Sequence, residues 1–240
     1  MRTLAIGDIH GCLTALETLL ETVDLQADDE IVTLGDYIDR GPDTKGVLDR
    51  LLALKQSHHL VALRGNHEQM MLDARSTYLK ATEEPHLYNP SIARSWLSVG
   101  GEEALASYGR GDFAERMDAV PPEHWDFMEN QCIDLWETET HFFVHGNAAP
   151  DRPLWDQPPH LLYWTTFDSA RPHQSGKIMV CGHTTQKNGL PRNLGYAVCI
   201  DTWAHGHGWL TALDVRSGRI WQANQFRQHR ELQLEDFLEG

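Results

Sequence analysis

The sequence predicts an α/β fold in one domain, 1–240, and three observations support this. Short apolar runs alternate with amphipathic helical patterns over residues 1–77, a helical and loop-rich stretch follows over 78–139, and residues 140–240 are rich in strand-like runs. The chain has 240 residues, of which 41% are hydrophobic and 23% are charged. This composition suits a globular domain with a substantial core and excludes a disordered chain.

The first 77 residues contain three strand–helix units in series. The expected strands are Thr3–Ile6, Ile31–Leu34 and Leu60–Leu63. Apolar residues at helical spacing follow over 13–23 and 47–54, and Gln69–Leu72 begins a third helix. Asp43 is the expected N-cap of the second helix. Strands that alternate with helices in this way pair in parallel through right-handed crossovers.

The middle and the end of the chain depart from this alternation. Residues 78–139 are interpreted as a helical insertion or cap, which Gly100-Gly101 interrupts and in which Pro121-Pro122 opens a later helix. Residues 140–240 form the β-rich second half, with Ser217-Gly218 as the turn of a hairpin. The strands expected there are His141–Val144, Ile178–Val180, Ala197–Ile200, Leu210–Val215 and Ile220–Ala223.

The charge balance and the cysteines limit the possible partners and compartment. With 35 acidic against 20 basic residues, the net charge of -15 argues against a nucleic-acid partner, although cations could still support phosphate chemistry at a local site. No run approaches the roughly 18–20 apolar residues of a membrane span, so no membrane partner is expected, and residues 1–7 resemble a first strand rather than a signal peptide. The four scattered cysteines are expected to be reduced, buried thiols of a cytoplasmic protein. They are Cys12, Cys132, Cys181 and Cys199.

Polar residues of the metal-ligand type follow each of the three early strands. Asp8 and His10 follow the first strand, Asp36 follows the second, and Asn66 with His67 follows the third. Each interval is about 30 residues, the length of one strand–helix–strand unit. Because the carboxyl ends of parallel strands meet at one edge of a sheet, we expect these side chains to converge.

Two later histidines extend this set. His145 follows the apolar run 142–144, and His183 follows the run that begins at Ile178. Two aspartates, three histidines and one asparagine then form a mixed oxygen and nitrogen donor set, which suits Mn, Fe or Zn better than Ca or Mg. Two metals about 3.5–4 Å apart need a shared carboxylate. Asp36, from the middle strand, is the predicted bridge.

Five short motifs occur at these strand ends. They are Gly7–Gly11 (GDIHG), Gly35–Gly41 (GDYIDRG), Arg64–Glu68 (RGNHE), Phe143–Gly146 (FVHG) and Cys181–Thr184 (CGHT). In this order they resemble the signatures of the phosphoprotein phosphatase (PPP) family of calcineurin-like metallophosphoesterases, and in particular its small bacterial and phage serine/threonine protein phosphatases. The resemblance implies a four-layer α/β/β/α sandwich with two mixed sheets and metals at the strand ends between them.

The resemblance also implies two divalent metal ions per chain, with manganese preferred and iron or zinc as alternatives. The implied ligands of the first ion are Asp8, His10 and Asp36. Those of the second ion are Asp36, Asn66, His145 and His183. A water that bridges the two ions, deprotonated to hydroxide, would attack phosphorus in line with the leaving group.

The same resemblance assigns the catalytic roles. His67 would protonate the leaving oxygen, with Asp39 orienting its imidazole and keeping it charged. Arg40 would bind the phosphoryl oxygens with its planar guanidinium, and Asn66 would contact the phosphate. These roles suit a phosphate monoester, because its charge must be neutralised and its alkoxide leaving group needs a proton.

Other residues are weaker candidates. Arg64 could contact the phosphate or support its loop through backbone carbonyls. Arg171 is the best-placed candidate for the second phosphate-binding arginine that the family carries between its two late histidines. His205-Gly206-His207 resembles a metal pair, but its glycine-rich setting favours an ordinary loop or a position at the substrate rim. Trp203 is the one tryptophan expected to line the cleft.

The motifs favour one substrate class over another. The symmetrical diadenosine-tetraphosphate hydrolases, which are close relatives, resemble GDLVARG and GNHD, whereas this chain has Asp39 and Glu68 at the differing positions. This difference favours phosphoserine and phosphothreonine in proteins, with diadenosine tetraphosphate or another small phosphoester as the alternative. A non-catalytic, metal-dependent binding module is a third hypothesis. The sequence predicts no oligomeric state.

Overall fold

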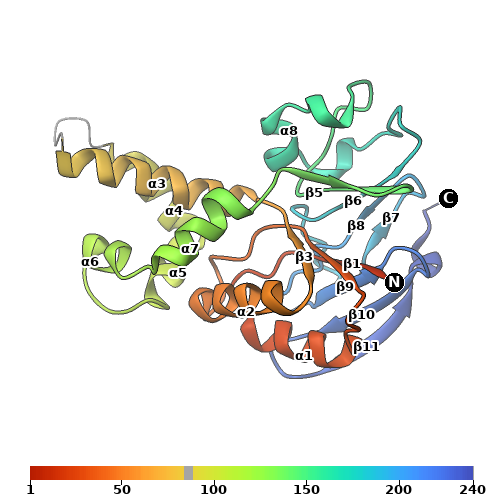
Figure 1. Cartoon of the computed structure of the whole chain (residues 1–240), viewed down its shortest axis with the longest axis horizontal. Coiled ribbons are helices and arrows are strands. Elements are labelled where there is room, and N and C mark those ends of the chain that lie inside the picture. Colours follow the sequence, from red (N-terminus) through yellow and green to blue (C-terminus); the bar gives the residue numbers. More distant parts are fainter. Residues whose placement is uncertain (84–88, 240) are drawn as a thin grey trace.

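The computed structural model describes residues 1–83 and 89–239, in which two β-sheets lie face to face (Figure 1). The first sheet has the order β11-β10-β9-β1-β2-β3. Its strands are β1 (Thr3–Ile6), β2 (Glu30–Thr33), β3 (His59–Ala62), β9 (Leu210–Asp214), β10 (Arg219–Ala223) and β11 (His229–Gln233). Strands β1, β2 and β3 are parallel, whereas β9, β10 and β11 join as antiparallel neighbours, so the sheet is mixed.

The second sheet has the order β4-β5-β6-β8-β7. Its strands are β4 (Leu135–Glu137), β5 (His141–Val144), β6 (Ile178–Cys181), β7 (Arg192–Asn193) and β8 (Ala197–Cys199). Strands β5, β6 and β8 are parallel, and the two edge strands pair with them antiparallel. Both sheets therefore place the carboxyl ends of three parallel strands at one edge, as the strand-end motifs predict.

Alternating side chains divide the core into three layers. In β1, Ala5 points between the sheets, where it joins Phe143 and Val180, while Leu4 and Ile6 pack on the opposite face. That opposite face is covered by α1 (Leu13–Val23) and α2 (Thr44–Ser57), whose N-cap Asp43 accepts a 2.8 Å bond from the Gly46 amide, as predicted. The outer face of the second sheet is covered by α8 (Pro159–Trp164). The order helix, sheet, sheet, helix confirms the predicted four-layer sandwich.

A lobe of helices projects from one side of the sandwich (Figure 1). It consists of α3 (Asn66–Glu83), α4 (Pro90–Trp96), α5 (Glu102–Ala106), α6 (Phe113–Asp118), α7 (Pro122–Asp126) and π-helical turns at Leu97–Gly101 and Phe127–Gln131. Helix α3 runs through residue 78, where the insertion was expected to begin, and β4 already belongs to the second sheet although it lies within 78–139. Three 3₁₀ turns complete the described elements: Leu154–Asp156, Phe167–Ser169 and Leu234–Phe237.

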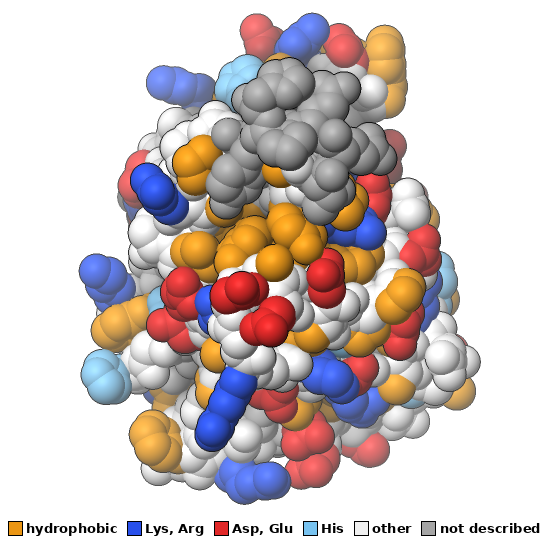
Figure 2. Space-filling model, turned by 90° about the vertical axis from the view of Figure 1, so that its left-hand side faces the viewer, with side chains coloured by type: hydrophobic (Ala, Val, Ile, Leu, Met, Phe, Trp, Pro, Cys, Tyr) orange, Lys and Arg blue, Asp and Glu red, His pale blue; other side chains and the backbone are white. Residues whose placement is uncertain are grey.

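The described part of the lobe's end face carries both acidic and basic side chains. Figure 2 shows acidic side chains gathered below a central group of hydrophobic ones, with lysine and arginine side chains mainly toward the edges and the lower part of the view. Elsewhere in the molecule, all four cysteines are buried and free. Among the described residues, no helix has the length and apolarity needed to cross a membrane.

Candidate active site

The loops that follow β1, β2 and β6 hold their polar residues in an unusual backbone conformation. His10, Asp36, Asp39, Arg40 and His183 all have positive φ angles, between 45° and 71°. Non-glycine residues rarely adopt this left-handed region, and such strain gathers at functional sites where the surrounding structure enforces it. Five strained residues from three separate loops therefore mark one built site.

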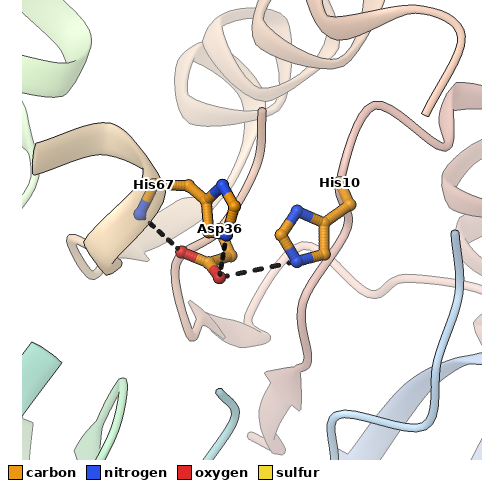
Figure 3. Close-up of side chains that lie close together, drawn as sticks. All are labelled: His10, Asp36 and His67. Carbon is orange, nitrogen blue, oxygen red and sulfur yellow. Dashed lines mark hydrogen bonds and ion pairs between the residues drawn. The ribbon is translucent and has the colours of Figure 1, made fainter. Parts of the chain in front are cut away.

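One cluster of potential metal ligands centres on Asp36. Its Oδ2 lies 3.5 Å from His10 Nε2 and 3.9 Å from His67 Nε2, and its Oδ1 accepts a 3.1 Å bond from the His67 amide. Figure 3 shows the two imidazole rings directed at this carboxylate from the loop after β1 and from the start of α3. All three residues are at most 2% exposed. The ligand atoms lie within 4.8 Å of one another, close enough to hold one cation.

A second cluster shares the same carboxylate. His145 Nε2 lies 3.4 Å from Asp36 Oδ1, and His183 completes this group. Asn66 joins them, because its Oδ1 lies 2.9 Å from both His145 Nε2 and His183 Nδ1. Asp36 thus belongs to both clusters, which is the geometry that the bridging prediction requires.

The histidine tautomers suit metal coordination. His10 Nδ1 lies 2.8 Å from the Ile38 carbonyl, and His145 Nδ1 lies 2.8 Å from the Leu34 carbonyl, so each ring can donate its proton outward and face Asp36 with a bare Nε2. Burial lowers the pKa of both imidazoles. Burial, followed by the charge of His145, lowers the pKa of His183 to about 4. These three rings are therefore neutral near pH 7, as metal ligands must be.

Three buried carboxylates add a need for positive charge. Asp8, Asp36 and Asp201 are each at most 2% exposed. Burial, together with the charges of Asp201 and Asp36, raises the pKa of Asp8 well above its ordinary value. Burial would also raise the pKa of Asp36, but the surrounding imidazoles, His145 foremost, lower it below its usual range. Neutral imidazoles beside buried carboxylates form a donor set that fits divalent transition metals.

Asp8 sits differently from the other implied ligands. Its carboxylate accepts the His183 amide at 3.0 and 3.2 Å, which links the loop after β1 to the loop after β6. A Cβ atom on Gly182 would lie 1.9 Å from Asp8 Oδ1, so only glycine fits there. His67, rather than Asp8, lies in the cluster around His10 and Asp36, although His67 is predicted to act as the acid and not as a ligand. The place of Asp8 among the first ion's ligands stays a prediction.

His67 is held by a buried aspartate. Its Nδ1 lies 2.6 Å from Asp39 Oδ2, and the Trp96 indole donates to the same carboxylate at 2.9 and 3.0 Å. Both Asp39 and Trp96 are fully buried. Burial would lower the pKa of His67, but the carboxylates of Asp36 and Asp39 raise it above its ordinary value. Asp39 thus orients the ring, and the two carboxylates favour its protonated form, which is the form that a general acid requires.

The Arg40 guanidinium lies within hydrogen-bond distance of both imidazoles of the first cluster. Nη1 lies 2.9 Å from His10 Nε2 and Nη2 lies 3.0 Å from His67 Nε2, while the side chain remains exposed. Its amide donates to the Gly100 carbonyl at 3.1 Å, and its Nε to the Val99 carbonyl. The helical lobe therefore supports this arginine directly.

Glu68 has a structural role that the sequence argument overlooked. Its two carboxylate oxygens accept the amides of Gly65, Asp36 and Tyr37 at 2.8–2.9 Å, and Ile38 at 3.4 Å. The side chain is fully buried, so it cannot touch a substrate. This carboxylate ties the second motif to the third, and its use as a marker of substrate class stays a prediction.

The structure places the two weaker arginine candidates in different settings. Arg64 donates to the carbonyls of Met128 and Glu129 at 3.2 and 2.7 Å, so it supports its loop, the second of the two roles considered. Arg171 is exposed, and the preceding Ala170 packs on the outer face of the second sheet. Among the described residues no hydrogen bond or ion pair joins its side chain to the clustered residues, and its role as a phosphate ligand stays a prediction.

Sequence reasoning missed two residues that the structure brings to the site. Trp96 had no signal beyond its place beside the Gly100-Gly101 break. Asp201 did have one, because it follows the apolar run 197–200 in the same way that Asp8 follows β1. Its carboxylate accepts the Thr185 hydroxyl at 2.7 Å and orders the loop that begins there.

Comparison with known proteins agrees with this geometry. The family profile described as calcineurin-like phosphoesterase matches residues 1–208. The chain belongs to the calcineurin-like phosphoesterase family. The PPP motifs lie within the matched region, and the family uses a dinuclear metal centre, consistent with the two clusters that share Asp36.

Relatives of this phosphoesterase differ in the substrates that their names state. The chain is 47% identical over 98 residues to serine/threonine-protein phosphatase 1 of Salmonella typhimurium, covering 40% of this chain and 38% of that protein. It is 35% identical over 168 residues to a symmetrical bis(5'-nucleosyl)-tetraphosphatase of Delftia acidovorans, covering 63% of this chain and 54% of that protein. The matches thus span less than two thirds of either relative.

A solved structure extends the likeness to the whole fold. A crystal structure described as a candidate diadenosine tetraphosphatase superposes with a TM-score of 0.62 at 19% identity. The superposition covers 97% of this chain and 93% of the other. At this identity the likeness shows the fold, which is the sandwich described above.

Proposed function

We propose that this phosphoesterase is a metal-dependent hydrolase of phosphoserine and phosphothreonine in proteins. The observation that carries the proposal is the buried pair of His67 and Asp39, 2.6 Å apart and braced by Trp96. In the proposed reaction this pair supplies a proton to the leaving oxygen, beside the two clusters of potential metal ligands. A serine or threonine alkoxide is a strong base and needs that proton when it leaves phosphorus.

The leaving group separates the two candidate reactions. Cleavage of a dinucleoside tetraphosphate releases a nucleoside diphosphate, which is stable as an anion near neutral pH and leaves without a proton. A fully buried aspartate that raises the pKa of His67 therefore has little use in that reaction. The pair is useful when the leaving oxygen is alkyl, as in phosphoserine.

The remaining residues have roles consistent with monoester hydrolysis. Asp36, His10, Asn66, His145 and His183 would hold two divalent ions, with Asp8 as the further predicted ligand. When bound, the ions supply an activated water and neutralise the phosphate charge, and manganese is the metal that we propose. Arg40 binds the phosphoryl oxygens through its exposed guanidinium.

Symmetrical cleavage of diadenosine tetraphosphate is the second candidate. The Delftia relative, whose name states this activity, aligns with 63% of the chain, against 40% for the Salmonella phosphatase. A non-catalytic binding module is disfavoured, because the predicted ligands, His67 and Arg40 are all present. We propose phosphoproteins as partners and the cytoplasm as the compartment, where the four buried thiols stay reduced.

A paired substrate assay tests the proposal. Metal-stripped protein reloaded with manganese is given a phosphoserine peptide and diadenosine tetraphosphate, alone and in competition. We expect peptide dephosphorylation to dominate, and His67→Asn to lower kcat on the peptide by about 10²–10⁴-fold. Its kcat on p-nitrophenyl phosphate should change much less, because nitrophenolate leaves without a proton. Dominant release of ADP, or equal losses on both esters, would count against the proposal.

A further inference from the structure

The loop between β8 and β9 borders the site, because its His205 packs against His10. It starts at Asp201, whose carboxylate accepts the Thr185 hydroxyl and the Trp203 amide. The Trp203 carbonyl accepts the amides of Gly206 and Gly208, which closes a tight turn. Trp203 itself has a φ of 69°, a conformation that is strained for a bulky residue. The loop is thus rigidly held.

His205, at the centre of this turn, lies against the first cluster of potential metal ligands. Its ring meets the ring of His10 edge-on, with centroids 4.8 Å apart. The charged groups that face it are Arg40, His67 and Asp36. The second histidine of the loop, His207, is exposed and contacts the Trp203 ring instead. The two histidines of the HGH segment therefore differ in position.

The hydrogen bonding of His205 is incomplete. Its Nδ1 is buried and has no hydrogen-bond partner among the described residues. The side chain as a whole is only partly buried. Among the described residues Nε2 has no hydrogen-bond partner, and it is not among the buried atoms, so it is open to solvent on a ring that packs against His10. Buried polar atoms in proteins are nearly always hydrogen-bonded. An imidazole that the loop holds in place without a protein partner is therefore suited to a hydrogen bond with a bound ligand.

We infer that His205 is a substrate-binding residue that hydrogen-bonds through Nε2 to an oxygen of the bound phosphoryl group. A phosphate monoester has three non-bridging oxygens. Arg40 is the arginine that the described residues place at the clusters, while Arg64 donates to backbone carbonyls and Arg171 is exposed. His205 supplies the contact that a second arginine was predicted to make.

The inference rests on the phosphoester chemistry of the proposed function, and it holds for a protein or a dinucleotide substrate alike. It is distinct from metal binding, because His205 lies outside both ligand groups that the described residues form. The ligand is a phosphate group, so inorganic phosphate is a sufficient probe. Binding of phosphate can be measured without any turnover.

Three variants test the inference in the manganese-loaded protein. His205→Phe keeps a ring against His10 but removes both nitrogens, His205→Gln restores a donor near Nε2, and His207→Phe is the matched control in the same loop. Calorimetry would measure the affinity for inorganic phosphate, and atomic emission would measure the metal content of each variant. We expect His205→Phe to weaken phosphate binding by roughly 10-fold or more at full metal content, since one hydrogen bond to a charged group is lost. His205→Gln should recover most of the affinity, and His207→Phe should match the parent.

Two outcomes would overturn the inference. Phosphate affinity unchanged in His205→Phe would show that the ring does not contact phosphate. Loss of manganese in His205→Phe would assign the ring to the metal site. If the parent protein fails to dephosphorylate the peptide but His205→Phe still weakens phosphate binding, the inference stands while the proposed substrate falls.

Discussion

At the scale of single residues, Asp39 links the chemistry to the helical lobe. It accepts from His67 on one side and from the Trp96 indole on the other, and it has no exposed surface. A buried carboxylate needs such partners, because an unpaired charge in the interior is costly. The motif alone predicted the pairing of Asp39 with His67. The tryptophan could not be foreseen, because it lies 57 positions along the chain.

Asp39→Asn tests how this carboxylate controls the acid. The charge of Asp39 helps to raise the pKa of His67, and the protonated ring is the active form, so activity on an alkyl ester falls as the pH rises through that pKa. Removing the charge lowers the pKa, so we expect the basic limb of the kcat profile to move to lower pH. The measurement is kcat against pH on a phosphoserine peptide.

Asp49→Asn is the control for this change. Asp49 of α2 and His124 of α7 form a second aspartate–histidine pair, in which Asp49 accepts a 3.0 Å hydrogen bond from His124 Nε2. This pair joins α2 to the lobe and is not part of either ligand cluster. The same substitution there should leave the pH profile unchanged. A basic limb that stays in place in Asp39→Asn would mean that another group sets it.

Glu68 combines a predicted role as a marker of substrate class with an observed structural role. Its carboxylate accepts the backbone amides of two motifs. We expect Glu68→Asp, which shortens the reach, to lower the free energy of unfolding by about 1–3 kcal/mol, as measured by urea denaturation. The ratio of peptide to dinucleotide turnover should stay the same. A switch toward the dinucleotide would restore the residue as a determinant of specificity.

At the scale of elements, the kinked segment Leu97–Gly101 of the lobe contacts the loop after β2 that carries Arg40. Gly100 has a φ of 123°, and its carbonyl accepts the Arg40 amide. A Cβ atom at this position would lie 2.5 Å from the Arg40 nitrogen. The glycine pair that interrupts the predicted insertion is therefore where the insertion contacts the site.

Gly100→Ala should displace Arg40 without removing any functional group. We expect the KM for phosphoesters to rise by roughly 10-fold, since a contact to a charged phosphoryl oxygen is weakened, with a smaller change in kcat. Gly109→Ala is the matched control, because Gly109 has a similar φ of 151° but a Cβ there would meet nothing within 4 Å. Equal effects of both changes would show that backbone strain, rather than the displacement of Arg40, is responsible.

Elements with strong periodic patterns were predictable, and others were not. Strands β1 and β5 and helix α1 match their predicted bounds, because their apolar residues are buried on defined faces. Strands β4 and β7 have three and two residues, too few to show alternation. Strand β11, with the sequence HRELQ, is polar and lies at a sheet edge, so its pairing with β10 could not be read from hydrophobicity.

At the scale of the whole molecule, the site joins the two sheets. Asp36 and Asn66 follow strands of the first sheet, whereas His145 and His183 follow strands of the second. The rule that the parallel strands of one sheet end at one edge predicts that Asp36 and Asn66 converge, and separately that His145 and His183 do. The meeting of the two sheet edges was implied by the family resemblance. The strand-end rule could not predict that His67 would join the group of His10 and Asp36, because this depends on side-chain directions set by tertiary packing.

Metal removal should therefore loosen the contact between the sheets. A ligand at 100 times its Kd stabilises the folded state by about 2.7 kcal/mol, and in a chain of this size each kcal/mol shifts Tm by about 2–4 °C. We expect a chelator to lower Tm by about 5–10 °C, and manganese to restore it. In Asp36→Asn, whose bridging carboxylate is lost, most of this metal-dependent shift should disappear. Calorimetry with parallel metal analysis would measure both. A shift retained in full by Asp36→Asn would mean that the ions bind without the carboxylate shared by the two clusters.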